Sequence, residues 1–102
     1  MYPHDVRDRL RAALDQAPAP TPGPGERLAA VLAPIIGTRE PSLVFTVRSS
    51  DLSRHAGEIS FPGGLQDGTE SLLETALRET AEEIGLDGTS VDVLGALSSV
   101  PI

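Results

Sequence analysis

The stretch "GGLQDGTESLLETALRETAEEIGL", residues 63–86, decides how this chain is interpreted. It carries six carboxylates and one arginine, and three of the carboxylates, Glu79, Glu82 and Glu83, lie close together in the sequence. On a helix their i, i+3 and i+4 spacing places all three on one face, with Cβ atoms about 5–6 Å apart. Like charges at this spacing destabilise an isolated helix, so the pattern calls for an explanation.

The residues around these carboxylates predict a helix over about residues 71–84. Ser71 and Glu74 have the spacing of a capping box, and Gly85 followed by Leu86 is typical of a left-handed helix end with an apolar contact behind it. We expect the helix to bury one stripe of side chains, formed by Leu73, Ala76, Leu77, Thr80 and Ile84.

Two interpretations of the acidic face remain open at this point. For most acidic triplets on a helix, the face is simply solvated. The alternative is a cation site, because a hard divalent ion takes several oxygen ligands, and convergent carboxylates with a backbone carbonyl provide them. Ions held in this way can clamp a pyrophosphate, polarise its phosphorus and lower the pKa of an attacking water. The neighbouring Arg78 and the glycine loop favour the second interpretation.

The composition excludes several classes of protein. A chain of 102 residues is long enough for one small domain. Its net charge of −7 and the lack of a Lys/Arg cluster argue against nucleic-acid binding. The absence of cysteine excludes disulfides, thiolate catalysis and Cys-ligated zinc. No apolar run approaches the ~20 residues of a membrane span, and the first residues lack the apolar core of a signal peptide, so we expect a cytoplasmic protein without a membrane partner.

The rest of the chain divides into three segments. Residues 1–17 predict an amphipathic helix, over about 5–16, whose apolar side should pack on the remainder, and residues 18–27 form a connector rich in Pro and Gly. Residues 27–36 and 42–49 read as two β-strands joined by a short loop, with Pro34 marking an edge position or a bulge. Further strands are expected at 58–61 and within 90–100, where Val91 and Val93 alternate with polar residues.

Residues 64–86 resemble the Nudix box of the Nudix hydrolases, GX5EX7REUXEEXGU, in which U is a bulky aliphatic residue. Each fixed Gly, Glu and Arg of the pattern is present. The one departure is Thr80 at an aliphatic position, where its shape resembles Val and its hydroxyl can bond a carbonyl one turn back.

The upstream residues "FTVRSSDLSRHAGEISFPGG" resemble the signature of coenzyme A pyrophosphatases in this superfamily, LLTXR(S/A)X3RX3GX3FPGG. Within this stretch two positions depart from it: Phe45 stands at the second Leu, and Ser53 stands at the second Arg, with Arg54 one place later. The positions that align are Thr46, Arg48, Ser49, Gly57, Phe61, Pro62, Gly63 and Gly64.

The resemblance implies roles for individual residues. It makes Glu79, Glu82 and Glu83 the catalytic metal ligands, completed by the backbone carbonyl of Gly64 or its neighbour. It implies that Glu70 and Arg78 form an ion pair that braces the loop against the helix, although an ordinary surface pair has the same spacing. The substrate-binding candidates are Arg48, Arg54, His55 and Phe61; for His55 a loop hydrogen bond, and for Phe61 simple loop packing, are alternatives.

The resemblance also implies an α/β fold, an α/β/α sandwich around a mixed sheet, with residues 28–102 forming the N-terminal portion of a Nudix domain. We expect the fold to be incomplete at its C-terminus, or completed by a second copy or another fragment. The implied reaction is attack of water on a phosphorus of a nucleoside diphosphate derivative with Mg²⁺ or Mn²⁺. For coenzyme A the products are 3',5'-ADP and 4'-phosphopantetheine. The alternatives are another substrate, such as ADP-ribose or a damaged nucleotide, and a non-catalytic Nudix-like binding or assembly module.

Overall fold

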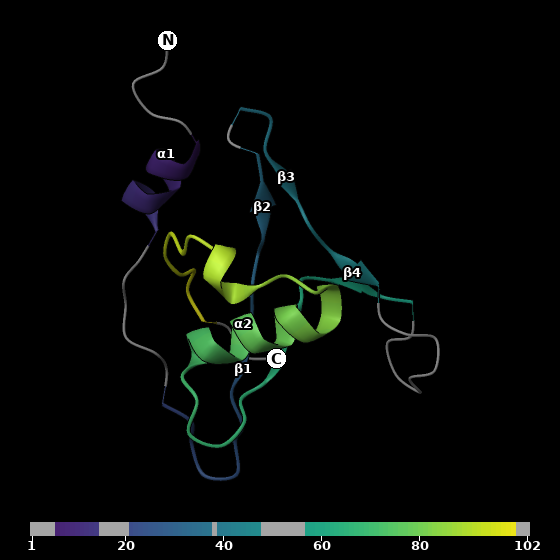
Figure 1. Ribbon diagram of the computed structural model, residues 1–102. Helices are drawn as coiled ribbons and strands as arrows, with labels where there is room; N and C mark the ends of the chain where they lie inside the picture. The colour runs from purple at the N-terminus through teal and green to yellow at the C-terminus, as the bar shows by residue number, and fades with distance from the viewer. Residues whose placement is uncertain (1–5, 15–20, 38, 48–56, 100–102) are drawn as a thin grey trace.

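The computed structural model describes residues 6–14, 21–37, 39–47 and 57–99 (Figure 1). Its helices are α1 (Val6–Ala13), α2 (Leu72–Ile84) and the short 3-10 helix η1 (Gly88–Ser90). Its strands are β1 (Ala29–Val31), β2 (Ile35–Ile36), β3 (Ser42–Leu43), β4 (Thr46–Val47), β5 (Ile59–Ser60) and β6 (Gly63–Leu65). The mixture of helices and strands is that of an α/β protein. The predicted sandwich around a mixed sheet stays a prediction, since the described strands form three antiparallel pairs, β1–β6, β2–β3 and β4–β5.

Helix α2 packs across the β1–β6 pair, and this is where the described core lies (Figure 1). The antiparallel register places Val31 opposite Gly63. A Cβ on Gly63 would collide with the carbonyl oxygen of Ala30 and lie 2.6 Å from the Cα of Val31, so only glycine allows this close approach. Strand β6 therefore lies tightly against β1, and this contact sets the position of the chain that leads from β6 to α2.

The two predicted strands, 27–36 and 42–49, are each interrupted. Their adjacent ends form the expected hairpin, in which Ile35 pairs with Leu43. Their outer ends pair elsewhere, because β1 takes β6 as its partner and β4 takes β5. Pro34 lies where the first run changes partner: Leu32 still donates to the Pro62 carbonyl at 2.8 Å, whereas the buried Pro34 accepts a hydrogen bond from Val44 at 3.0 Å. Proline has no N–H for a ladder, which explains why the run divides at this residue.

Two expectations about apolar residues are wrong. The buried stripe of α2 is narrower than predicted, because Leu73 is 47% exposed and Ile84 is 38% exposed. A two-stranded pair covers only part of a helix face, so burial is limited to Thr75, Ala76 and Thr80. The strand expected within 90–100 is also absent from the described part: residues 91–99 contain one isolated bridge residue and no strand. Alternation of apolar and polar residues favours a strand but does not by itself provide the partner with which a strand has to pair.

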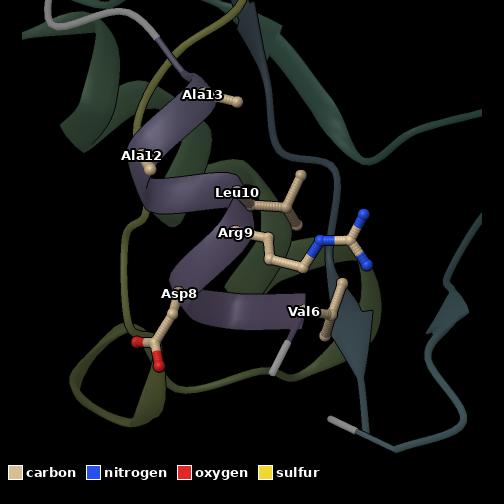
Figure 2. A pocket seen from close by; sticks show the side chains of 6 residues that line it. All are labelled: Val6, Asp8, Arg9, Leu10, Ala12 and Ala13. Carbon is tan, nitrogen blue, oxygen red and sulfur yellow. The ribbon is translucent and has the colours of Figure 1, made fainter. Parts of the chain in front are cut away.

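Helix α1 confirms the helix predicted near the amino end, although it is shorter than predicted. No residue of α1 is buried, so the expected packing of its apolar side is not seen in the described part of the chain. Arg11 Nη2 instead lies 2.7 Å from Asp92 Oδ2, which ties the helix to the segment after η1. An open hollow runs along α1, and it contains none of the predicted site residues (Figure 2). Its lining is Val6, Asp8, Arg9, Leu10, Ala12 and Ala13.

None of the helices in the described residues is long and apolar enough to cross a membrane.

Candidate active site

The start and end of α2 are set by the predicted capping residues. Ser71 Oγ accepts a hydrogen bond from the Glu74 amide at 3.1 Å, and the Glu74 carboxylate accepts one from the Ser71 amide at 2.7 Å. This is the capping box predicted from the sequence. At the other end Gly85 has φ 73° and donates to the Ala81 carbonyl at 2.9 Å. The residues at which the helix begins and ends are therefore set by local contacts.

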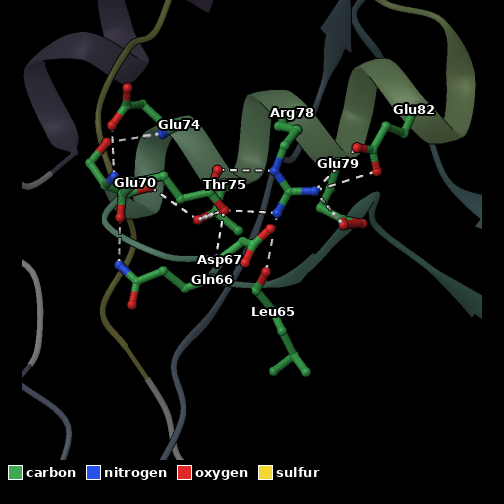
Figure 3. Close-up of polar contacts among 10 residues, drawn as sticks. Leu65, Gln66, Asp67, Glu70, Glu74, Thr75, Arg78, Glu79 and Glu82 are labelled. Carbon is green, nitrogen blue, oxygen red and sulfur yellow. Dashed lines mark hydrogen bonds and ion pairs between the residues drawn. The ribbon is translucent and has the colours of Figure 1, made fainter.

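Glu70 precedes α2 and receives hydrogen bonds from both the loop and the helix (Figure 3). Its Oε1 accepts from the Asp67 amide at 2.8 Å and from Thr75 Oγ1 at 2.9 Å. The guanidinium of Arg78 donates to both carboxylate oxygens, from Nη2 to Oε1 at 2.7 Å and from Nε to Oε2 at 3.0 Å. This bidentate pair confirms the predicted contact between Glu70 and Arg78.

These contacts shift the pKa of both partners. Hydrogen bonding to Arg78 is the largest cause of the shift at Glu70, helped by the Asp67 amide and the Thr75 hydroxyl. Together they lower the pKa of Glu70 from 4.5 to about 2, against the opposing effect of desolvation. The pKa of Arg78 is raised further above its usual range, mainly by its hydrogen bond to Glu70. Both groups are therefore charged at neutral pH.

The remaining edge of the Arg78 guanidinium faces the acidic residues of α2 (Figure 3). Nη1 donates to Glu79 Oε2 at 3.1 Å and to Glu82 Oε1 at 3.2 Å. Nη2, besides holding Glu70, donates to the backbone carbonyl of Leu65 at 3.3 Å. The guanidinium of Arg78 thus lies between two of the predicted metal ligands, and its positive charge offsets the repulsion between the two carboxylates.

Glu79 also lies against the glycine loop. A Cβ built on Gly64 would stand 2.6 Å from Cδ of Glu79, 2.7 Å from Oε1 and 2.9 Å from Oε2. The carboxylate therefore occupies the space that a side chain at this position would fill. Carboxylate and backbone oxygens are the donors that Mg²⁺ and Mn²⁺ take, so the residues that meet here fit a divalent cation in chemical type.

The structure does not gather all of the predicted ligands. Within the described residues, no group of three or more His, Asp or Glu side chains lies close enough together to hold a metal ion. Glu79 and Glu82 meet at Arg78, whereas Glu83 lies on an exposed part of the helix. The metal-ligand set therefore stays a prediction. The substrate candidates Arg48, Arg54 and His55 fall outside the described residues.

Two features of this region escaped the sequence interpretation. Thr75 is fully buried and links Glu70 to the Ser71 carbonyl, with Oγ1 at 3.0 Å from that oxygen. Its signal was its place one turn of helix after the capping residue, on the side of Arg78. The second feature is the pairing of Phe61 with Phe45, whose rings stack with centroids 4.6 Å apart. Each ring lies within a strand predicted from the sequence, 42–49 or 58–61, which was the available signal.

Comparison with known proteins supports the superfamily. The model of the NUDIX domain family matches residues 26–101. The chain belongs to this family. This confirms the superfamily predicted from residues 64–86.

Curated relatives point in the same direction. The chain is 48% identical to "Uncharacterized Nudix hydrolase NudL" of Pectobacterium atrosepticum over 85% of its own length and 46% of the relative. Proteins of the same name in Cronobacter sakazakii and Yersinia enterocolitica are 46% and 51% identical, over 74% and 69% of this chain. The chain spans 40% and 36% of these two, so it covers less than half of each of the three relatives.

Nudix enzymes generally use divalent cations such as Mg²⁺ or Mn²⁺, and the oxygen-rich surroundings of Glu79 suit ions of this kind.

Proposed function

We propose that this chain is a Nudix-type pyrophosphohydrolase that cleaves the diphosphate of coenzyme A or a related nucleoside diphosphate derivative. The observation that carries the proposal is the arrangement of Arg78, which is braced by Glu70 and holds Glu79 and Glu82 together beside Gly64. A structural ion pair alone explains the contact with Glu70. It does not explain why two further carboxylates meet at the same guanidinium, one of them in the space that a side chain at Gly64 would fill.

Glu79, Glu82 and Glu83, with a backbone carbonyl at or next to Gly64, would hold the Mg²⁺ or Mn²⁺. Such ions supply positive charge beside the diphosphate oxygens and lower the pKa of a bound water. The chain's own residues prepare the acidic face: the Arg78 N–H and the Gly64 backbone orient the Glu79 carboxylate, and Glu70 fixes the guanidinium that does so. The capping box fixes the residue at which the helix begins.

Coenzyme A is proposed as the substrate on the resemblance of residues 45–64 to the coenzyme A pyrophosphatase signature. The candidates for contacts with its phosphates are Arg48, Arg54 and His55, each of which can donate hydrogen bonds to a phosphate oxygen. Water attack on the diphosphate releases 3',5'-ADP and 4'-phosphopantetheine and requires no covalent enzyme intermediate. The absence of cysteine therefore does not oppose this reaction.

The test is a product assay on a small panel of diphosphates. The purified chain is incubated with Mg²⁺ or Mn²⁺ and either coenzyme A or ADP-ribose. The products are separated and identified by mass spectrometry. We expect coenzyme A to yield 3',5'-ADP and 4'-phosphopantetheine, and Glu82→Gln to abolish the cleavage. Glu74→Gln, also on α2 but in the capping box, is the matched control and should retain it.

The other outcomes separate the alternatives. Cleavage of ADP-ribose in preference to coenzyme A would reassign the substrate and keep the hydrolase. Metal binding without cleavage of any diphosphate would contradict the proposal and favour a non-catalytic module.

A further inference from the structure

Two aromatic rings are stacked at the β4–β5 pair, close in sequence to the candidate site. Phe45 directly precedes β4 and Phe61 directly follows β5, and their ring centroids are 4.6 Å apart with an interplanar angle of 18°. The pair continues the antiparallel register in which Thr46 lies opposite Ser60. Thr46 Oγ1 also donates to the Ser60 carbonyl at 3.2 Å, which adds a side-chain contact to this register. The two rings therefore hold a defined mutual orientation.

One ring of this pair remains open to solvent. Phe45 is 49% exposed even though one of its faces lies on Phe61. A cross-strand aromatic pair helps to hold two strands together, and that role alone would be served by any two apolar side chains of suitable size. A flat ring with an accessible surface, supported from behind by a second ring, additionally offers a surface on which another planar group can stack.

The backbone connects this ring pair to the acidic face of α2. Phe61 is followed by the fully buried Pro62, then by Gly63, which is pinned against Val31, and then by Gly64, which adjoins Glu79. Three residues of extended chain span at most about 11 Å, so the Cα atom of Phe61 lies within about that distance of the Cα atom of Gly64, the residue that adjoins Glu79. In a nucleoside diphosphate derivative, a ribose separates the base from the diphosphate, so its base contact has to lie near the reacting bond without adjoining it.

We infer that Phe45, backed by Phe61, forms a stacking platform for the nucleobase of the substrate. The inference rests on the proposed hydrolysis of a nucleoside diphosphate derivative and assigns its specificity for the nucleoside half to these rings. Every nucleobase has a π-face, so such a platform accepts different bases and discriminates against substrates that have none. Phe45 is also one of the positions at which this chain departs from the coenzyme A pyrophosphatase signature, with a ring where that signature has Leu.

The test compares binding of a ligand that carries a base with one that does not. Wild-type chain, Phe45→Leu and Phe45→Tyr are titrated with ADP and with ribose 5-phosphate in the presence of Mg²⁺, and dissociation constants are measured by NMR. Leu43→Val, at a similarly exposed apolar residue of β3, is the matched control. We expect Phe45→Leu to weaken ADP binding about tenfold or more and to leave ribose 5-phosphate unchanged, because loss of base–aromatic stacking affects only the ligand with a base. Phe45→Tyr and Leu43→Val should bind both ligands as the wild type does.

Three results overturn the inference: no binding of ADP by the wild type, equal ADP binding by Phe45→Leu and the wild type, or equal weakening of both ligands. The third is what a purely structural role predicts, and the dispersion of the backbone NMR spectrum shows directly whether Phe45→Leu has lost its fold. The assay needs no turnover, so its outcome is independent of the proposed hydrolysis. ADP binding through Phe45 without cleavage of any diphosphate keeps the platform and contradicts the hydrolase, whereas cleavage of coenzyme A with an unchanged KM in Phe45→Leu does the reverse.

Discussion

Adding one methyl group at each of two neighbouring glycines should separate stability from metal binding. Neither Gly63 nor Gly64 has a positive φ, so substitution by alanine changes the space that the residue fills and not its allowed backbone conformation. At Gly64 the new Cβ meets the end of the Glu79 side chain, 2.6–2.9 Å away. At Gly63 it meets the backbone of β1, including the Cα of Val31 at 2.6 Å.

The expected magnitudes follow from what has to move. The Glu79 carboxylate must shift by about 1 Å to reach van der Waals separation from the new methyl group, and a flexible side chain does so at little cost in folding free energy. A shift of this size in a ligand weakens metal binding by about 10- to 100-fold, the range seen when the partners of ligating groups are removed. The backbone of β1 cannot move in this way, so Gly63→Ala should destabilise the fold by about 1–3 kcal/mol.

Electron paramagnetic resonance measures the affinity for Mn²⁺, and unfolding by urea measures the stability of the fold. Gly64→Ala should weaken Mn²⁺ binding and leave the stability nearly unchanged. Gly63→Ala should instead lower the stability. The reasoning fails if Gly64→Ala binds Mn²⁺ as tightly as the wild type, because the contact between Gly64 and Glu79 would then play no part in holding the ion.

Three further changes test the frame of the site. Glu70, whose pKa is lowered to about 2, stabilises the fold above pH 4.5, and this contribution disappears as the pH falls toward 2. In Glu70→Gln the free energy of unfolding, measured by urea titration, should therefore fall less between these two pH values than it does in the wild type. An equal fall in both proteins would contradict the role given to the contact of Glu70 with Arg78. Ser71→Ala removes the N-cap and should cost about 1 kcal/mol in urea unfolding; no loss would show that the helix start is held by other contacts. Thr80 is buried and its hydroxyl donates to the Ala76 carbonyl at 2.6 Å. Thr80→Val keeps the shape and should change stability by less than about 1 kcal/mol, whereas a larger loss would give that hydroxyl an unforeseen role.

The local part of the site was predictable because its determinants are close in sequence. The capping box, the left-handed Gly85 and the ion pair between Glu70 and Arg78 each follow from residue types at fixed spacings of eight residues or fewer. Such contacts depend on one helix and its flanking loop.

The pairing of strands was less predictable, since it depends on partners distant in the sequence. Nothing local to the first apolar run shows that β1 pairs with β6 while β2 pairs with β3, apart from Pro34 at the division. The strand expected around Val91 and Val93 is not formed, for the same reason. Alternation of apolar and polar residues shows only that a strand is favoured locally, whereas a strand also needs a pairing partner elsewhere in the chain. Leu73 and Ile84 were expected to be buried because they extend the apolar stripe, and they are exposed because the strand pair beneath α2 is narrower than that stripe.

The convergence of Glu79 and Glu82 on one nitrogen of Arg78 lies between these two cases. Helical spacing predicted that the carboxylates share a face, but it could not predict that the guanidinium, already paired with Glu70, would reach both of them. That second contact depends on where β6 and the loop after it hold Glu70 against the helix.

The central claim, that the acidic face of α2 is a metal site, is tested most directly by the number of Mn²⁺ ions bound per chain in single Glu→Gln variants. Electron paramagnetic resonance measures free Mn²⁺ at each step of a titration of the wild type, Glu79→Gln, Glu82→Gln and Glu74→Gln. We expect saturable binding by the wild type and by Glu74→Gln, with affinity reduced about tenfold or more in Glu79→Gln and Glu82→Gln. Equal binding by all four proteins, or loss in Glu74→Gln as large as in Glu82→Gln, would show that Mn²⁺ responds only to the general acidity of the helix and would contradict the account.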